Sequence, residues 1–155
     1  MLQVLYYARK ELCLQIEIED DTIIRISFCD HALNHVVEGD FQAEIIQQLE
    51  SWFCGKRLDF DLAFFATGTP FQLKVWEETM RIPYGKTISY AEIAKRIGRE
   101  NAVRAVGAAL RANPVPLLIP CHRVIGSNGN LTGYAGSIPV KALLLNLEQQ
   151  YSSEK

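Results

Sequence analysis

Residues 67–70, Thr-Gly-Thr-Pro, separate two stretches of different hydrophobic periodicity, so the chain cannot fold as one uniform architecture. Before this break apolar and polar residues alternate or cluster as in β-strands, and after it apolar residues recur at helical spacing. Charge changes at the same place. Residues 1–68 hold 5 Lys/Arg and 12 Asp/Glu, a net charge of −7, whereas residues 69–155 hold 11 and 6, a net charge of +5. We predict an acidic α/β domain over 1–68 and a basic, mainly helical domain over 69–155.

The acidic half has the pattern of a small antiparallel sheet with one helix. β-formers fill residues 2–28, and Asp20-Asp21 between two such runs is typical of a hairpin turn. Apolar residues at helical spacing predict a helix over 39–53 that ends before Gly55. Residues 58–66 alternate weakly and indicate a strand or an extended linker.

The basic half begins with a helix whose N-cap is Thr69 and whose first residue is Pro70. A capping box, Ser89 with Glu92, predicts a short helix ending at Gly98. A second helix follows from about 101 to 112 and stops at Asn113-Pro114, because the residue before proline avoids the helical region. Two short helices joined by a tight turn outline a helix-turn-helix.

The second of these helices is thin, because six of its residues are alanine or glycine and its charges are Arg104 and Arg111. Small residues permit close packing against another helix, which is the common explanation for such a composition. They also permit a slim helix to enter a nucleic-acid groove. Together with the positive charge of this half, the second reading points to a polyanionic partner.

Composition predicts a globular protein, since 48% of residues are hydrophobic and 22% charged. No apolar run approaches a membrane span, and a soluble intracellular chain is expected. Four cysteines are too few for a disulfide scaffold, so we expect reduced thiols. A zinc set of Cys13, Cys29, His31 and His35 is conceivable, but no Cys-x-x-Cys pair supports it. We predict three buried structural thiols, Cys13, Cys29 and Cys54, and no required metal.

The fourth cysteine, Cys121, lies beside His122 after a stiff apolar stretch that contains three prolines. Such a pair can be a buried thiol next to a core histidine, or a nucleophile with its base. In an extended segment the two side chains would point to opposite faces, so proton transfer would need a bend or a bridging water.

Several motifs in one order decide between these readings: residues 68–72 (Gly-Thr-Pro-Phe-Gln), 82–85 (Ile-Pro-Tyr-Gly), 102–107 (Ala-Val-Arg-Ala-Val-Gly), 120–124 (Pro-Cys-His-Arg-Val) and 133–136 (Gly-Tyr-Ala-Gly). With Asn113-Pro114 they resemble the O6-alkylguanine-DNA alkyltransferases over essentially the whole basic half. The resemblance implies an α/β (α+β) chain, with a ribonuclease H-like N-terminal domain and a winged helix-turn-helix domain carrying the cysteine.

The resemblance also implies the reaction, which is irreversible transfer of an alkyl group from O6 of guanine, and with less support O4 of thymine, to Cys121. His122 would be the base, acting through water, and Glu148 would orient it. Glu148 follows Leu144 and Leu145 on a partly apolar helical face, where a carboxylate needs a partner. Asn113 would be a supporting hinge residue.

DNA contacts are implied in the same way. Arg104 would replace an extruded nucleotide in the base stack, because the alkylated atom lies inside the duplex. The other residues carried over for DNA or base binding are Tyr90, Arg111, Pro116, Val124, Tyr134, Ala135 and Gly136, with Lys95 as a weaker phosphate contact. Ala135 departs from members that have serine there, so only its backbone N–H could donate to O6.

The resemblance implies that each chain acts once, because no nearby base can hydrolyse a thioether. It implies no organic cofactor, since the lesion is the alkyl donor. We expect double-stranded DNA containing O6-alkylguanine as the partner, no membrane, a monomer, and a cytoplasmic or, in a eukaryote, nuclear location. Two alternatives stay open: a Cys-His-Glu hydrolase that turns over through a thioester, and a helix-turn-helix protein that binds lesions without repairing them.

Overall fold

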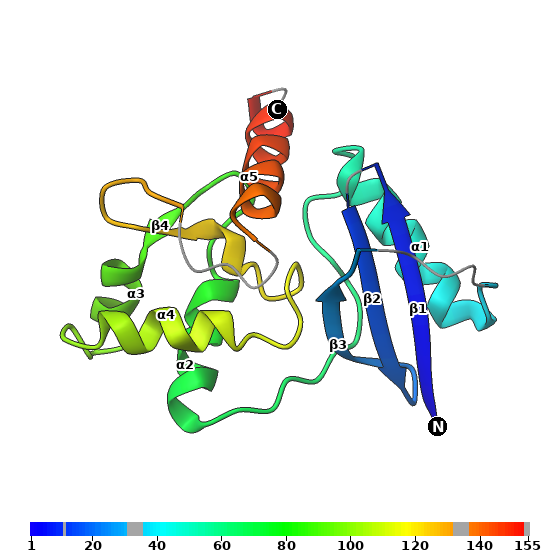
Figure 1. Cartoon of the computed structure of the whole chain (residues 1–155), viewed down its shortest axis with the longest axis horizontal. Coiled ribbons are helices and arrows are strands. Elements are labelled where there is room, and N and C mark those ends of the chain that lie inside the picture. The colour runs from blue at the N-terminus through cyan, green and yellow to red at the C-terminus, as the bar shows by residue number, and fades with distance from the viewer. Residues whose placement is uncertain (11, 31–35, 132–136, 154–155) are drawn as a thin grey trace. The chain divides into compact units, whose positions relative to one another are not determined.

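The computed structural model describes residues 1–10, 12–30, 36–131 and 137–153, and the chain forms two compact units, Met1–Ala66 and Thr67–Lys155 (Figure 1). Its class is mixed α and β, as predicted. Among the helices that are described, none combines the length and the apolar character needed to span a membrane.

The first unit is built on a three-stranded antiparallel sheet in the order β1-β2-β3, with β1 at Leu2–Arg9, β2 at Leu12–Glu19 and β3 at Thr22–Phe28. The predicted hairpin is confirmed: Asp20 and Asp21 join β2 to β3, and their φ angles of 50° and 53° are those of a tight two-residue turn. Alternate residues of β2, such as Leu14, Ile16 and Ile18, are buried, which gives the sheet one apolar face.

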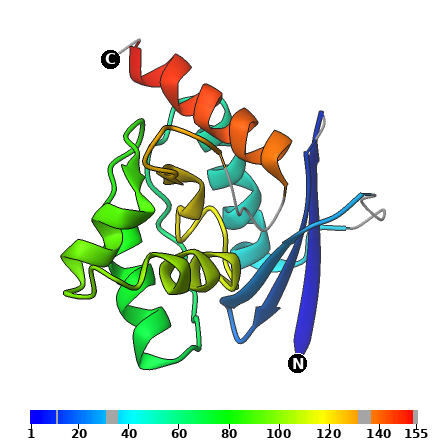
Figure 2. The ribbon, with the colours of Figure 1, turned by 60° about the vertical axis from the view of Figure 1, so that its left-hand side comes forward.

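The predicted helix is confirmed as α1, Gly39–Phe53, which lies along one face of the sheet (Figures 1 and 2). Its buried residues Ile45, Leu49 and Trp52 supply the other half of this unit's core. The stretch 58–66 is extended: Ile23 donates its N–H to the carbonyl of Ala63 and accepts from the N–H of Phe65, so this stretch pairs briefly with β3.

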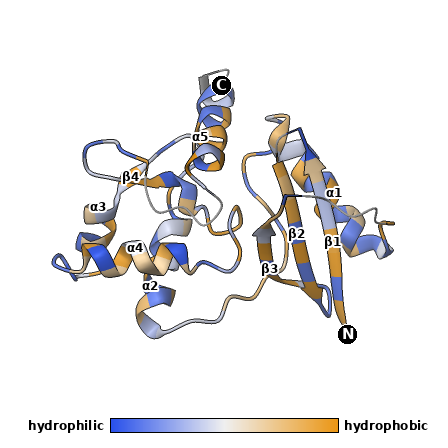
Figure 3. Cartoon of the chain, viewed as in Figure 1, coloured by the Kyte–Doolittle hydropathy of each residue, from blue (hydrophilic) through white to orange (hydrophobic). Residues whose placement is uncertain are grey.

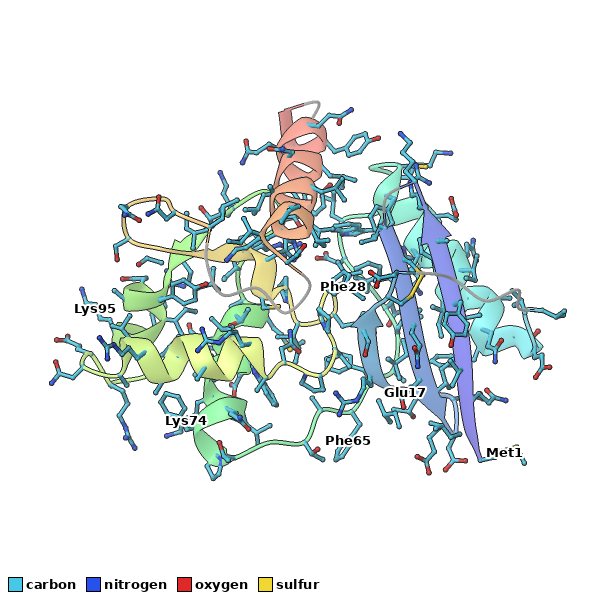
Figure 4. All side chains as sticks on the ribbon, in the orientation of Figure 1. Met1, Glu17, Phe28, Phe65, Lys74 and Lys95 are labelled. Carbon is cyan, nitrogen blue, oxygen red and sulfur yellow. A yellow bond between two sulfur atoms is a disulfide. The ribbon has the colours of Figure 1, made fainter. Side chains whose placement is uncertain are left out.

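The prediction of three buried, reduced thiols in this half was wrong. Cys13 and Cys29 form a disulfide, drawn as a yellow bond in Figure 4, and Cys54 is exposed. The pairing of β2 with β3 explains the bond. Leu14 lies opposite Phe28, so the next residues, Cys13 and Cys29, also face each other, with Cα atoms 5.2 Å apart. That separation lies inside the range that a disulfide requires.

Removing this disulfide is expected to lower the free energy of unfolding of the first unit. The bond closes a loop across 16 positions, and in the chain-entropy account a loop of this size contributes about 3 kcal/mol. We expect a Cys13→Ser/Cys29→Ser protein to unfold at lower denaturant concentration than the unreduced wild type. Dithiothreitol should shift the curves of wild type and of Cys54→Ser, which both keep the bond, and should leave the double variant unchanged. Cys54→Ser is the matched control. Identical curves for both serine variants and wild type would contradict the bond.

The second unit holds the predicted helices. These are α2 (Pro70–Met80), α3 (Tyr90–Arg96), α4 (Val103–Arg111) and α5 (Ile138–Ser153). Thr69 forms a complete capping box with Gln72 at the start of α2, and the Ser89 hydroxyl accepts from the N–H of Glu92 at the start of α3. The second helix of the pair begins two residues later than expected, at Val103, with Ala102 as its N-cap.

Near Cys121 the structure differs in two ways from the mainly helical domain that the sequence predicts. Residues Cys121–Arg123 form one turn of 3₁₀ helix, η1, rather than an extended segment. Immediately after it, β5 (Val124–Ile125) pairs in parallel with β4 (Ile88–Ser89), which leads into α3. This short pairing joins the cysteine segment to the start of the helix-turn-helix. Two-residue strands carry too little periodicity to be visible in a sequence.

Candidate active site

The segment that carries Cys121 is held by hydrogen bonds from Asn113. The Asn113 side-chain oxygen accepts from the N–H of Val115 at 2.9 Å, and its amide donates to the carbonyl of Ile119 at 2.8 Å. The same carbonyl accepts from the N–H of Cys121 at 2.7 Å. One buried side chain therefore ties both ends of the loop that precedes the cysteine.

Cys121 is buried, with 4% of its surface exposed. Burial raises the pKa of its thiol from 9.0 to about 11, because a thiolate loses hydration there, while Asn113 and Lys141 act in the opposite direction. The thiol is protonated at neutral pH and needs a base when it reacts.

The base predicted for this step lies next in the chain. His122 is fully buried, and its Nε2 lies 2.7 Å from Oε2 of Glu148, which is also fully buried on α5. Burial lowers the pKa of His122, and Arg123 and Lys141 lower it further, against the effect of Glu148. Burial by itself would raise the pKa of Glu148, but His122 and Arg123 bring it down to about 2. The resting pair is therefore a neutral imidazole and a carboxylate.

Arg123 completes the surroundings of this carboxylate. Its Nε donates to both oxygens of Glu148 at 3.0 Å, and Nη2 donates to Oε2 at 2.9 Å. Its Nη1 donates to the carbonyl of Ile82 at 2.7 Å. The N–H of Gly85, in the same turn as Ile82, donates to Oε1 of Glu148 at 3.0 Å. A buried charge of this kind is stable only with such a set of donors.

A second buried cation, Lys141, lies on the same side of α5. Its Nζ donates to the carbonyl of Val124 at 2.6 Å and to the hydroxyl of Tyr90 at 3.3 Å, and it lies 5.5 Å from the centre of the Tyr90 ring. Tyr90 is the first residue of α3. The lysine on α5 therefore contacts β5 and the start of α3, and contributes positive charge near Cys121.

The predicted DNA-contacting arginines lie elsewhere in this unit, on α4. Val106, Ala109 and Leu110 are buried, and the indole of Trp76 on α2 donates to the carbonyl of Ala109 at 2.8 Å. This leaves a face on which Arg104 and Arg111 are exposed together with alanines. Figure 3 shows the mixed hydropathy along α4, and Figure 4 labels Lys95 on α3. The packing explanation of the thin helix is confirmed for the buried face of α4, and the exposed face leaves entry into a nucleic-acid groove as a prediction.

The structure thus brings together Cys121, His122, Glu148, Asn113, Tyr90 and Val124, and it places Arg104 and Arg111 on a separate surface. Pro116 is buried in the loop before the cysteine. Tyr134, Ala135 and Gly136 lie outside the described residues, as do His31 and His35 of the zinc set considered above. Within the described part of the chain, no three His, Cys, Asp or Glu side chains are grouped as metal ligands.

Two buried charges were missed by the sequence analysis, Arg123 and Lys141. A signal for Lys141 existed: with Leu144 and Glu148 it occupies positions i, i+3 and i+7 of one helical face. Arg123 stands inside the cysteine motif, but nothing local in the sequence indicates its partner 25 residues away.

Taken together, a helix-turn-helix with an arginine-bearing face and a buried cysteine beside a His-Glu pair define a nucleic-acid-binding protein with a thiol nucleophile. Residues 70–150 match the family profile "6-O-methylguanine DNA methyltransferase, DNA binding domain". A constitutive methylated-DNA–protein-cysteine methyltransferase of Bacillus subtilis is 54% identical over 114 residues, which are 73% of this chain and 69% of that protein.

Comparison with solved structures leads to the same family. A crystal structure of the Mycobacterium tuberculosis O6-methylguanine methyltransferase has a TM-score of 0.86 and 34% identity, covering 97% of this chain and 94% of that one. A structure of the Mycobacterium tuberculosis protein in complex with DNA has a TM-score of 0.83 and 36% identity, over 94% and 92% of the two chains. The chain belongs to the O6-methylguanine-DNA methyltransferase family.

Proposed function

We propose that this methylated-DNA–protein-cysteine methyltransferase repairs O6-alkylguanine in double-stranded DNA with Cys121 as the alkyl acceptor. The observation that carries the proposal is the buried His122–Glu148 pair adjoining a buried thiol. Family membership supplies the reaction class, and the geometry around Cys121 supports it as the acceptor. The other free cysteine, Cys54, is exposed in the first unit, where its sulfur lies 3.9 Å from Nη2 of Arg9.

The reaction follows from the protonation states. Glu148 is ionised and can only accept, so the proton of the neutral imidazole lies on Nε2, and Nδ1 is the basic nitrogen. We propose that His122 takes the thiol proton through a water molecule. The sulfur then forms a bond to the alkyl carbon, the bond from that carbon to O6 breaks, and its electron pair stays with the guanine. Glu148 stabilises the imidazolium while it exists.

The target atom lies inside a duplex, so the nucleotide must be extruded before it reaches a buried thiol. We propose that α4 enters the minor groove and that Arg104 fills the vacated position, with Arg111 and Lys95 at phosphates. The exposed alanines of α4 allow close approach to the DNA. Tyr90 and the backbone at Cys121 and Val124 would contact the extruded base, beside the apolar Pro116.

Each chain would react once, because the product is a thioether. We propose two domains, 1–68 and 69–155, with DNA binding and alkyl acceptance in the second. The protein would act as a monomer in the compartment that holds the DNA, which is the cytoplasm, or the nucleus in a eukaryote. O4-alkylthymine would be a second substrate.

The test is intact-mass spectrometry after mixing the protein with an equal amount of duplex bearing one O6-methylguanine, followed by peptide mapping. We expect a gain of one methyl group per chain, on Cys121, saturating at one equivalent. The same duplex with unmodified guanine is the control and should leave the mass unchanged.

The remaining outcomes distinguish the alternatives. Lesion binding with unchanged mass would identify a recognition protein whose thiol is not activated. Turnover of thioester or amide substrates, with no methylated product, would identify a hydrolase. A methyl group on another residue would overturn the assignment of Cys121.

A further inference from the structure

The carboxylate of Glu148 is held by more donors than an orienting partner of histidine requires. Besides His122, it accepts three hydrogen bonds from the Arg123 guanidinium and one from the N–H of Gly85, all at 2.9 to 3.0 Å. The side chain of Glu148 is fully buried and that of Arg123 is 7% exposed. A carboxylate with this many donors, one of them permanently charged, remains ionised.

Arg123 is itself fixed by the turn between α2 and β4. The carbonyl of Ile82 accepts from Nη1 at 2.7 Å, and the guanidinium lies 5.6 Å from the centre of the Tyr84 ring. Gly85 gives the turn its shape: its φ is +81°, and a Cβ on it would overlap the hydroxyl of Ser152 on α5. The side chain of Gln149 donates to the carbonyl of Gly85 at 3.0 Å. The Ile-Pro-Tyr-Gly motif therefore holds the side chains of Arg123 and Glu148 in place, in addition to ending α2.

Charge balance determines the state of His122. The charged groups that act on it are Arg123 on η1 and Lys141 and Glu148 on α5. The titratable groups around these charges are Cys121 and Tyr90, which interact with Lys141, and Tyr84, which interacts with Glu148, Arg123 and Tyr151. Arg123 is permanently positive and Lys141 is a second cation, against one carboxylate. A further proton on the imidazole would place a third positive charge in this buried cluster, where such charges repel strongly.

We propose that Arg123, fixed by the Ile82–Gly85 turn, is a positioning residue that keeps Glu148 ionised and His122 neutral, so that Nδ1 is available as a base. This inference rests on the proposed function of Cys121 and His122. Without Arg123, the negative charge of Glu148 would favour a protonated His122. His122 would then already carry a proton on Nδ1 and could not take one from the thiol. The acid limb of the reaction would then begin at a higher pH.

The test follows the protonation of His122 directly by nitrogen-edited NMR, which is practical because the chain has three histidines. The proteins are wild type, Arg123→Met, Arg123→Lys and the control Arg25→Met, an exposed arginine in the first unit. We expect wild-type His122 to carry only the Nε2 proton at pH 7. In Arg123→Met it should protonate about one pH unit higher or more, a tenfold change in the equilibrium. Arg123→Lys should shift it less, and the control should leave it unchanged.

Methyl-transfer rates against pH provide the second measurement. The acid limb should move upward in Arg123→Met by the same amount as the His122 titration. A folded Arg123→Met protein with an unmoved titration overturns the proposal, even if it is less stable, because a purely structural arginine would alter stability alone. If Arg123→Met does not fold, the test is the protonation state of His122 in the wild-type protein at pH 7. A ring protonated on both nitrogens overturns the proposal, and a ring protonated only on Nε2 supports it.

Failure of the proposed function remains distinguishable. A wild-type protein that accepts no methyl group would refute the role of Cys121, while the NMR titration would still report what Arg123 does to His122.

Discussion

Replacing Cys121 by alanine is expected to abolish methyl transfer completely while leaving binding to lesion-containing DNA. Alanine has no atom that can accept an alkyl group. His122 does not replace the sulfur as acceptor, because its proposed role is to take the thiol proton through a water molecule. The change removes one small buried atom from η1 and leaves the Asn113 bracing, which uses backbone groups of Val115 and Ile119. The measurement is the methyl count by mass spectrometry beside binding by fluorescence anisotropy.

Cys54→Ala is the matched control, because it removes the other free thiol, which is exposed. It should accept one methyl group per chain as wild type does. Methylation of the Cys121→Ala protein at any residue would contradict the assignment. Loss of DNA binding together with transfer would show that the substitution damages more than the nucleophile.

Replacing Glu148 by glutamine is expected to have the largest effect on stability. The amide has nearly the same shape but no charge, so Arg123 would be buried without a counter-ion, and such broken buried pairs typically lose about 3–5 kcal/mol. Transfer should fall about 10²- to 10⁴-fold, the range for loss of general-base catalysis, since His122 loses its oriented acceptor. Denaturant unfolding and single-turnover rates measure the two effects.

The same carboxylate predicts how stability depends on pH. Its pKa is depressed to about 2 in the folded protein, so its contribution is complete above the unfolded pKa near 4.5 and is lost as pH falls from about 5 towards 2. The lowered pKa of His122 acts in the same direction, because the unfolded chain takes up a proton below about pH 6.5 that the folded chain resists. Wild type should therefore destabilise in acid, and Glu148→Gln should lose the lower part of this dependence.

Glu92→Gln is the comparison for this variant. Glu92 pairs with Arg96 on the surface of α3, where both side chains are 41% exposed, and such pairs contribute about 0–1 kcal/mol. A Glu148→Gln protein no less stable than Glu92→Gln would mean that the buried cluster does not depend on charge.

Features determined by neighbouring residues were predictable from the sequence. The Asp20-Asp21 hairpin, the Thr69 cap of α2 and the end of the helix before Asn113-Pro114 all follow from short-range backbone preferences. The roles of Cys121, His122 and Glu148 came from a motif resemblance, and the structure then placed the histidine and the glutamate within hydrogen-bond distance.

Features determined by distant partners were not predictable. The Cys13–Cys29 bond depends on the register of β2 and β3, and the Arg123–Glu148 pair depends on how α5 docks on η1. The raised pKa of Cys121 was missed for the same reason, because burial is a property of the packed domain and a motif does not carry it.

The burial of Cys121 has a consequence for a protein that serves as its own reagent. Burial raises the pKa of the Cys121 thiol to about 11, so a much smaller fraction of it is thiolate at neutral pH than in an ordinary exposed cysteine. Oxidants and soluble alkylating agents react with thiolates, so they would react slowly with this protonated thiol in the absence of DNA. If Cys121 is the alkyl acceptor and each chain reacts once, as proposed, the same burial would protect the thiol from side reactions until it meets a DNA lesion.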